Sequence, residues 1–158
     1  MKKKTVIFDL DGTLADIEPR RLISMKTNGK LNFEIFFDPK NIVLDIPNHP
    51  VIETFKALEE AGYRMLIFSG RSEATRAVTI EWLSEYGIHP DKMIMRPTEP
   101  KELAYMQDDL LKKMWFEEEF PTEEDKESIL CVYDDRDKVV KMWRDNYITC
   151  FQCDYGNF

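Results

Sequence analysis

The chain is poor in the residues that carry disulfide or zinc chemistry, with three cysteines and two histidines among 158 residues. Only Cys150 and Cys153 are spaced as a pair, no second pair follows, and His49 and His89 lie far from both. A disulfide framework or a zinc site needs more ligands than this. We therefore interpret the cysteines as structural thiols.

Long apolar runs are also missing. After the lysines that follow Met1, only Val6 to Phe8 is apolar before Asp9, which is too short for the core of a secretory signal. No segment approaches the roughly 20 apolar residues of a membrane helix. We therefore expect a cytoplasmic protein that has no contact with a membrane. Hydrophobic residues still make up 43% of the chain and aromatic residues 12%, enough for the core of one domain.

Basic residues are fewer than acidic ones, so the net charge is −8. This balance argues against a protein that coats long stretches of nucleic acid, although a local basic patch can still hold one strand end. Much of the acid lies between Glu117 and Glu127, where seven carboxylates accompany one lysine. We interpret this run as a solvated surface segment.

Short apolar segments alternate with amphipathic ones. The pattern predicts strands at residues 5–8, 64–68, 93–95, 129–133 and 148–152, and helices at 51–61, 72–87, 100–115 and around 139–143. This order predicts a Rossmann-like α/β fold, in which helices cover both faces of a parallel sheet within a single domain of residues 1–158.

The polar segment from Arg20 to His49 interrupts the alternation and carries Phe33, Phe36 and Phe37. We expect it to be a small insertion after the first strand that lies over the site, or an extra hairpin on the sheet.

The sequence Asp9-Leu10-Asp11-Gly12-Thr13 follows the first expected strand, where parallel sheets place their reactive groups. Two carboxylates one residue apart can divide the cleavage of a phosphate ester. Asp9 can attack phosphorus, while Asp11 gives a proton to the leaving oxygen and later takes one from water. Gly12 permits a sharp turn close to a phosphate, and Thr13 adds a hydroxyl and an amide. Alone, the motif is also compatible with an acidic turn that faces water.

Further polar groups follow the other strands. Ser69-Gly70-Arg71 offers a hydroxyl and amides for a phosphoryl oxygen, or simply an N-cap. Asp134 and Asp135 can complete an oxygen-only Mg²⁺ site with Asp9, or precede a helix. Lys112 can neutralise the nucleophile and the phosphate, or face solvent. Because an anionic nucleophile that attacks a phosphate needs a cation between them, the combination favours a Mg²⁺-dependent phosphatase.

The order of these motifs resembles the haloacid dehalogenase-like (HAD) phosphatase superfamily. The four matching motifs are Phe8 to Leu14, Ser69, Lys112 and Asp134-Asp135. The resemblance implies an aspartyl-phosphate intermediate on Asp9. It also implies a Mg²⁺ ion held by Asp9, the backbone carbonyl of Asp11 and the two aspartates of the fourth motif. The presence of Asp11 favours phosphoryl transfer over dehalogenation.

A closer resemblance is to the 3′-phosphatase domain of phage polynucleotide kinases. It is carried by Asp134 to Arg144, Cys150 to Gln152, Gly156 to Phe158, Ser69 to Arg71 and Asp108 to Lys112. The resemblance implies that two arginines and one further acid serve the reaction, at positions matched here by Arg20, Arg71 and Asp108. Arginine suits that task because its planar fork pairs with two phosphate oxygens.

This resemblance implies an enzyme that removes 3′-phosphates from DNA or RNA ends, with 2′,3′-cyclic phosphates as a related substrate class and a separate kinase or ligase as partner. No Gly-x4-Gly-Lys-Ser/Thr loop is present in the chain, so 5′-kinase activity is not expected. Basic residues near the expected mouth and the three phenylalanines suit a strand end. The basic residues are Arg20, Arg21, Lys26 and Lys30.

Two alternatives stay open. A nucleotidase or another small-molecule phosphatase would use the same machinery. A catalytically inactive HAD fold that only binds a ligand is disfavoured, because every chemical residue of the four motifs is present.

Overall fold

A five-stranded parallel sheet forms the centre of the computed structural model, which describes residues 2–158. Its strands are β1 (Thr5–Phe8), β4 (Arg64–Ser72), β5 (Lys92–Arg96), β6 (Ile129–Asp134) and β7 (Cys150–Gln152). The order across the sheet is β5-β4-β1-β6-β7, so β1 lies in the middle. This arrangement confirms the expected Rossmann-like α/β fold.

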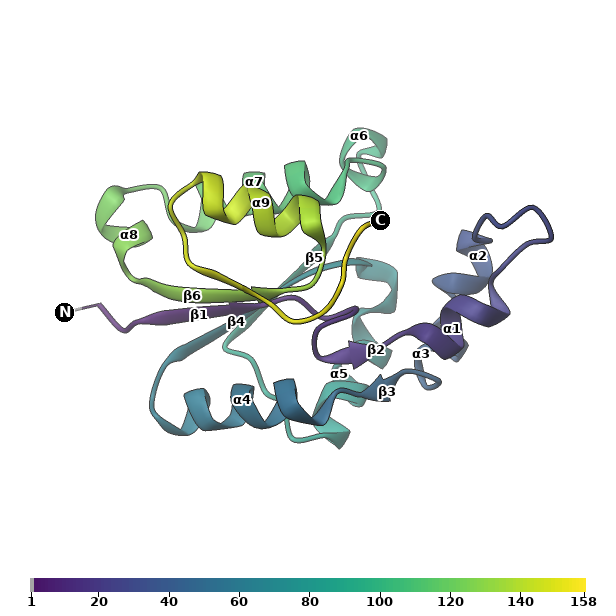
Figure 1. Cartoon of the computed structure of the whole chain (residues 1–158), viewed down its shortest axis with the longest axis horizontal. Coiled ribbons are helices and arrows are strands. Elements are labelled where there is room, and N and C mark those ends of the chain that lie inside the picture. Colours follow the sequence, from purple (N-terminus) through teal and green to yellow (C-terminus); the bar gives the residue numbers. More distant parts are fainter. Residues whose placement is uncertain (1) are drawn as a thin grey trace.

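Helices cover both faces of the sheet (Figure 1). One face carries α4 (His49–Glu60) and α5 (Arg76–Glu85), and the other carries α7 (Asp108–Glu119) and α9 (Asp137–Asp145). Successive residues of a strand point to opposite faces, so Val6 and Phe8 of β1 pack toward α4 and α5, whereas Ile7 packs toward α7 and α9. Two apolar cores therefore hold β1 in place, and with it the loop that follows.

The helix predicted over residues 100–115 is two helices, α6 (Lys101–Ala104) and α7. The guanidinium group of Arg96 donates hydrogen bonds to the carbonyls of Leu103, Ala104 and Met106 at 3.4, 3.4 and 2.6 Å. These carbonyls are satisfied by a side chain instead of by a continuing helix, which explains the break.

Other predicted bounds differ by less. The strand predicted from residue 148 begins at Cys150, because Tyr147 before it has a φ of 61° and turns the chain. The helix predicted over residues 72–87 begins with the 3₁₀ turn Glu73–Thr75, which precedes α5. Ser72 caps this turn by accepting a hydrogen bond from the amide of Ala74.

The acidic run of residues 117–127 covers the end of α7 and α8 (Glu123–Glu127). Most of its carboxylates are exposed, as predicted. Glu119 and Asp125 are partly buried: Glu119 forms ion pairs with Arg64 at 2.7 Å and with Lys92, and Asp125 forms one with Lys2 at 2.5 Å. Within residues 2–158 no helix has the length and apolar character needed to cross a bilayer.

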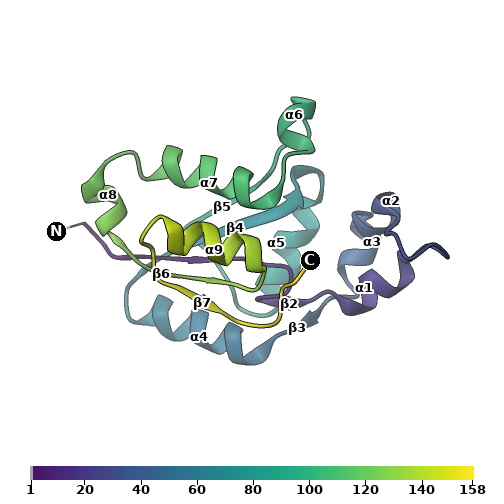
Figure 2. The same cartoon turned by 45° about the horizontal axis from the view of Figure 1, so that its top comes forward.

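The residues after β1 build a small separate structure beside the carboxyl ends of the sheet (Figures 1 and 2). It consists of β2 (Ala15–Asp16), α1 (Glu18–Ile23), α2 (Phe33–Phe36), α3 (Pro39–Ile42) and β3 (Ile46–Pro47). Since β2 and β3 pair with each other, antiparallel, the alternative of an extra hairpin on the main sheet is wrong. We call residues 17–45 the cap segment; an insertion spanning residues 20–49 stays a prediction.

Candidate active site

The loop after β1 is a tight turn organised around one carbonyl. The oxygen of Leu10 accepts hydrogen bonds from three successive amides, those of Thr13, Leu14 and Ala15, at 2.9–3.1 Å. Gly12 has a φ of 81°, and a Cβ atom there would lie 2.1 Å from a carboxylate oxygen of Asp135. Only glycine fits this turn, which brings the first motif against the fourth.

Three carboxylates meet above β1 and its neighbour β6. Asp9, Asp134 and Asp135 are buried, and each offers an oxygen within 4.8 Å of the others. We call these residues the carboxylate cluster. From α7, Lys112 Nζ contacts Asp9 Oδ1 at 2.7 Å and Asp134 Oδ2 at 2.8 Å. The adjacent Lys113 is exposed, so Lys112 is the lysine that reaches the site.

The carboxylate cluster carries more negative charge than Lys112 balances. Burial and the nearby Asp134 raise the pKa of Asp9 well above its ordinary value, and the same two causes raise the pKa of Asp135 to about 6. Burial disfavours the charged form of Lys112, but Asp134 and Asp9 outweigh it and raise its pKa. The cluster offers three carboxylate oxygens and carries more negative than positive charge, a combination that suits a small hard cation such as Mg²⁺.

A second group of buried charges lies beside the first. Arg20 from α1 and Arg71 from β4 are fully buried. Both guanidinium groups donate to Asp11 Oδ1, from Arg20 Nη2 at 3.0 Å and from Arg71 Nε at 2.7 Å. Both also reach Asp45, whose Oδ1 accepts from Arg20 Nε at 2.9 Å and whose Oδ2 accepts from Arg71 Nη2 at 2.5 Å. We call these four residues the arginine group.

Asp11 is held in its charged form by this group. Burial alone would raise its pKa, but the charges of Arg71 and Arg20 hold the pKa below the ordinary value. Its carboxylate therefore does not join the carboxylate cluster. The predicted metal contact of Asp11 through its backbone carbonyl stays a prediction.

The second predicted motif lies within β4, which runs on past residue 68 with an irregularity between Ser69 and Ser72. Ser69 is buried, and its Oγ accepts a hydrogen bond from the amide of Arg71 at 3.2 Å. A Cβ atom on Gly70 would lie 2.4 Å from Asp108 Oδ1, so this motif packs directly on α7. Asp108 in turn lies 3.7 Å from the Nζ of Lys112.

Thr13 completes the inner site. It is fully buried, and its Oγ1 donates to Asp9 Oδ2 at 3.5 Å, a long contact. The structure thus brings the predicted site residues together in two adjoining groups joined by the first motif.

The aromatic residues of the cap segment divide into two kinds. Phe36 is buried, and the Arg20 guanidinium lies 4.4 Å from its ring centroid, so this ring is not available to a base. Phe33 is 64% exposed and stacks on Phe37 with 6.0 Å between centroids. Arg20 itself is buried and is not part of a basic surface.

Asp45 is the residue that sequence reasoning missed. Its partners Arg20 and Arg71 lie 25 and 26 positions away, and no motif surrounds it. The indole Nε1 of Trp82 donates to its backbone carbonyl at 3.1 Å, which fixes the turn before β3. Only the fold reveals that this acid holds both arginines.

Comparison with known proteins identifies the family. Residues 3–158 match the model of the "Polynucleotide kinase PNKP phosphatase domain". The chain belongs to this HAD-type phosphatase family. The PNKP-type domain is also 31% identical over 145 residues to a "Putative bifunctional polynucleotide kinase/RNA ligase" of Autographa californica nuclear polyhedrosis virus. That match covers 90% of this domain and 18% of the viral protein.

Solved structures agree with the family. Two structures of a Pnkp1/Rnl/Hen1 complex, one described as an RNA repair complex, contain a chain 32% and 33% identical to this domain, with TM-scores of 0.74 and 0.73. Each match covers 99% of this domain but only 47% and 44% of the larger chain. A "predicted phosphatase from Clostridium acetobutylicum" has a TM-score of 0.71 at 12% identity, over 96% of this domain and 85% of that chain, and shares the fold. The domain therefore spans less than half the length of the viral relative and of the chain in the Pnkp1/Rnl/Hen1 complex.

Proposed function

We propose that this domain is a Mg²⁺-dependent phosphomonoesterase that forms an aspartyl-phosphate on Asp9 and removes 3′-phosphates from nucleic-acid ends. The observation that carries the proposal is the position of Asp9. One of its oxygens lies on the Lys112 ammonium at 2.7 Å, and the carboxylate faces the two aspartates of β6 and its following loop. This placement supports a nucleophile that is buried, oriented and ready to share a cation with a phosphate.

The chemistry divides between the two acids of the first motif. In the first step, a bond forms between an Asp9 oxygen and phosphorus while the bond from phosphorus to the substrate 3′-oxygen breaks, and Asp11 gives that oxygen a proton. In the second step, water attacks phosphorus, Asp11 takes its proton, and the bond to Asp9 breaks to release inorganic phosphate. The ammonium of Lys112 stabilises charge on the phosphoryl oxygens. A bound Mg²⁺ ion, held by the carboxylate cluster, would neutralise charge between Asp9 and the phosphate.

The arginine group sets the protonation of Asp11. With both guanidinium groups on its carboxylate, Asp11 is in the basic form that the second step needs. A substrate phosphate competes for the same guanidinium groups, because phosphate matches their fork as well as carboxylate does. Loosening the contact raises the pKa of Asp11 and favours the protonated form that the first step needs.

The substrate class follows from the family. Its model describes the phosphatase domain of a polynucleotide kinase, and the solved relatives belong to a complex described as acting in RNA repair. We therefore propose a nucleic-acid 3′-end, with a 2′,3′-cyclic phosphate as a related substrate. The chain has no P-loop sequence, so a kinase or ligase that acts on the same end would be contributed by other residues or another protein.

The deciding experiment measures phosphate release, with Mg²⁺, from one oligonucleotide that bears a 3′-phosphate. Its 5′-phosphate twin, a 3′-mononucleotide and the Asp9→Asn variant are the controls. We expect rapid release from the 3′-end, none from the 5′-end and none by the variant. A nucleic-acid substrate should also give a steeper loss of rate with added salt than a mononucleotide.

Equal or faster release from the mononucleotide would show a nucleotidase instead. Absence of release from every substrate would refute an enzymatic role and favour a binding domain.

A further inference from the structure

The segment after β7, residues 153–158, is fixed to the loop that carries two members of the carboxylate cluster. The amide of Cys153 donates to the carbonyl of Asp134 at 3.0 Å, and the amide of Asp137 donates to the carbonyl of Gly156 at 3.0 Å. A Cβ atom on Gly156 would lie 1.9 Å from the carbonyl oxygen of Asp135. The backbone on both sides of Tyr155 is therefore packed against the reaction centre.

Tyr155 itself is 97% exposed. Its amide is engaged, since it donates to Asp154 Oδ1 at 2.7 Å, but among residues 2–158 its ring stacks on no other aromatic ring. The neighbouring Phe151, by contrast, stacks on Tyr133 with 5.2 Å between centroids. A large aromatic side chain in water on a fixed backbone adds little to folding and is suited to stacking on a flat ligand.

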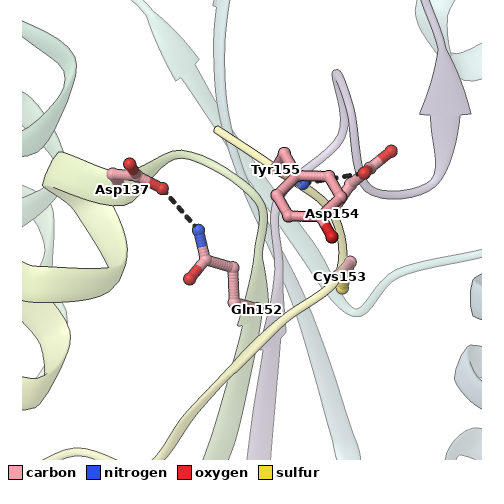
Figure 3. Close-up of a pocket in the computed structure, with 5 residues that line it drawn as sticks. All are labelled: Asp137, Gln152, Cys153, Asp154 and Tyr155. Atoms are coloured by element: carbon pink, nitrogen blue, oxygen red, sulfur yellow. Dashed lines mark hydrogen bonds between the residues drawn. The ribbon is translucent and has the colours of Figure 1, made fainter. Parts of the chain in front are cut away.

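A shallow open cavity of about 420 Å³ lies beside this ring, within the size range of small-ligand sites. It is lined by Asp137, Gln152, Cys153, Asp154 and Tyr155 (Figure 3). Gln152 joins the two sides, because its Nε2 donates to the carbonyl of Asp135 at 2.9 Å and to Asp137 Oδ1 at 2.7 Å. A hydrogen bond from Gln152 thus links the lining of the cavity to the loop that carries Asp135.

The charge of the cavity decides which part of a substrate it can take. Asp137 and Asp154 place two carboxylates on its lining, and these repel a phosphodiester group. They accept hydrogen bonds from the amino groups of a base and the hydroxyls of a sugar. A flat ring that carries hydrogen-bond donors is the part of a nucleotide that fits, with its phosphate directed to the cluster.

We propose that Tyr155 stacks on the base of the nucleotide that bears the 3′-phosphate and makes the domain select nucleotide ends over simple phosphate esters. This inference rests on the proposed function, because it names the substrate group that the same site holds. Stacking fixes the nucleoside, so the 3′-oxygen is presented to Asp11 in one orientation.

The test compares Tyr155→Ala with two matched variants. Tyr155→Phe keeps the ring and removes the hydroxyl. Tyr147→Ala removes a tyrosine that is 98% exposed but lies between α9 and β7, at the opposite end of the sheet. For each protein, kcat/KM is measured with a 3′-phosphorylated oligonucleotide and with glycerol 2-phosphate, which has no ring that can stack.

Tyr155→Ala is expected to lower the ratio of the two kcat/KM values about tenfold, in line with the loss of one base–aromatic stack. Tyr155→Phe and Tyr147→Ala are expected to keep the ratio of the unchanged protein. An equal fall on both substrates would show a structural role for Tyr155 and overturn the inference.

A second readout separates stacking from turnover. An oligonucleotide whose 3′-terminal base is 2-aminopurine is titrated with the Asp9→Asn protein, and stacking on Tyr155 should quench its fluorescence. Quenching that survives Tyr155→Ala, or no binding at all, would overturn the inference. Quenching that depends on Tyr155, together with no phosphate release by the unchanged protein, would refute the proposed function and leave the stacking site standing.

Discussion

The carboxylate cluster and the arginine group lie side by side, but their charges are balanced differently. In the carboxylate cluster, three acids share the single ammonium of Lys112. In the arginine group, two guanidinium groups face two carboxylates. The carboxylate cluster therefore keeps an excess of negative charge, whereas the arginine group is neutral and assembled by the fold alone.

The two aspartates of the first motif show the same contrast. Asp9 and Asp11 are separated by one residue, yet burial raises the pKa of Asp9 while two arginines lower that of Asp11. Pairs of acids whose surroundings move their pKa values apart are typical of sites that need two different carboxylate roles. Here neighbours on other elements, not the motif itself, move the two pKa values in opposite directions.

The largest effects are expected from two isosteric substitutions, which test the charge difference between the carboxylate cluster and the arginine group. Asp9→Asn should lower phosphate release by about 10⁴-fold or more, because it removes the attacking oxygen. It also removes one of three buried carboxylates that repel each other, so the Tm in metal-free buffer should stay equal or rise. Asp11→Asn should lower the Tm, because two buried guanidinium groups lose a partner. Thermal melts of both variants check this, and equal falls in Tm would contradict the charge difference.

Removal of metal ions by a chelator tests the carboxylate cluster separately from the arginine group. A chelator should abolish phosphate release, and Mg²⁺ at about 100 times its Kd should stabilise the fold by about 2.7 kcal/mol. The Mg²⁺-dependent rise in Tm should disappear in Asp135→Asn and persist in Asp45→Asn, which alters only the arginine group. Stabilisation that is retained without Asp135 would place the metal elsewhere.

Asp45→Asn tests the arginine group without touching a reacting atom. We expect a fall in kcat/KM of about 100-fold, because Arg20 and Arg71 lose the carboxylate that orients them. Asp38→Asn is the matched control, since Asp38 is another acid of the cap segment and caps α3 by accepting from the amide of Lys40. Comparable losses in both variants would argue against a positioning role.

The smallest effect is a shift of metal affinity with pH. Because the pKa of Asp135 is about 6, its protonated form favours the metal-free fold, a contribution lost as the pH rises through that value. Mg²⁺ binds the ionised form of Asp135. If binding displaces one proton from this carboxyl group, the Kd of Mg²⁺ should be about fourfold higher at pH 5.5 than at pH 7.5. Calorimetric titration at the two pH values measures this, and a constant Kd would exclude Asp135 as a ligand.

The sequence was sufficient for the five strands of the main sheet and for the acids at their ends, because buried strands are short apolar runs and parallel strands present their carboxyl ends together. It did not reveal β2 and β3, which are two residues long each. It could not show the break between α6 and α7, which depends on Arg96 from a different strand. Nor could it separate Lys112 from Lys113, which differ only in the face of α7 that they occupy. The sequence also showed no sign of Asp45, because its partners Arg20 and Arg71 come close to it only in the folded chain.

The arginine group also restricts how the site can move. Arg20 and Asp45 belong to the cap segment, whereas Arg71 belongs to β4 and Asp11 follows β1, so two ion pairs, Arg20–Asp11 and Arg71–Asp45, connect the cap segment to the sheet. Movement of the cap segment away from the sheet would separate charges that are largely shielded from water, at a cost of about 3–5 kcal/mol for each broken pair. The cap segment is therefore a fixed wall rather than a lid, and under the proposed function the end of a strand of any length would enter without an opening of the cap segment.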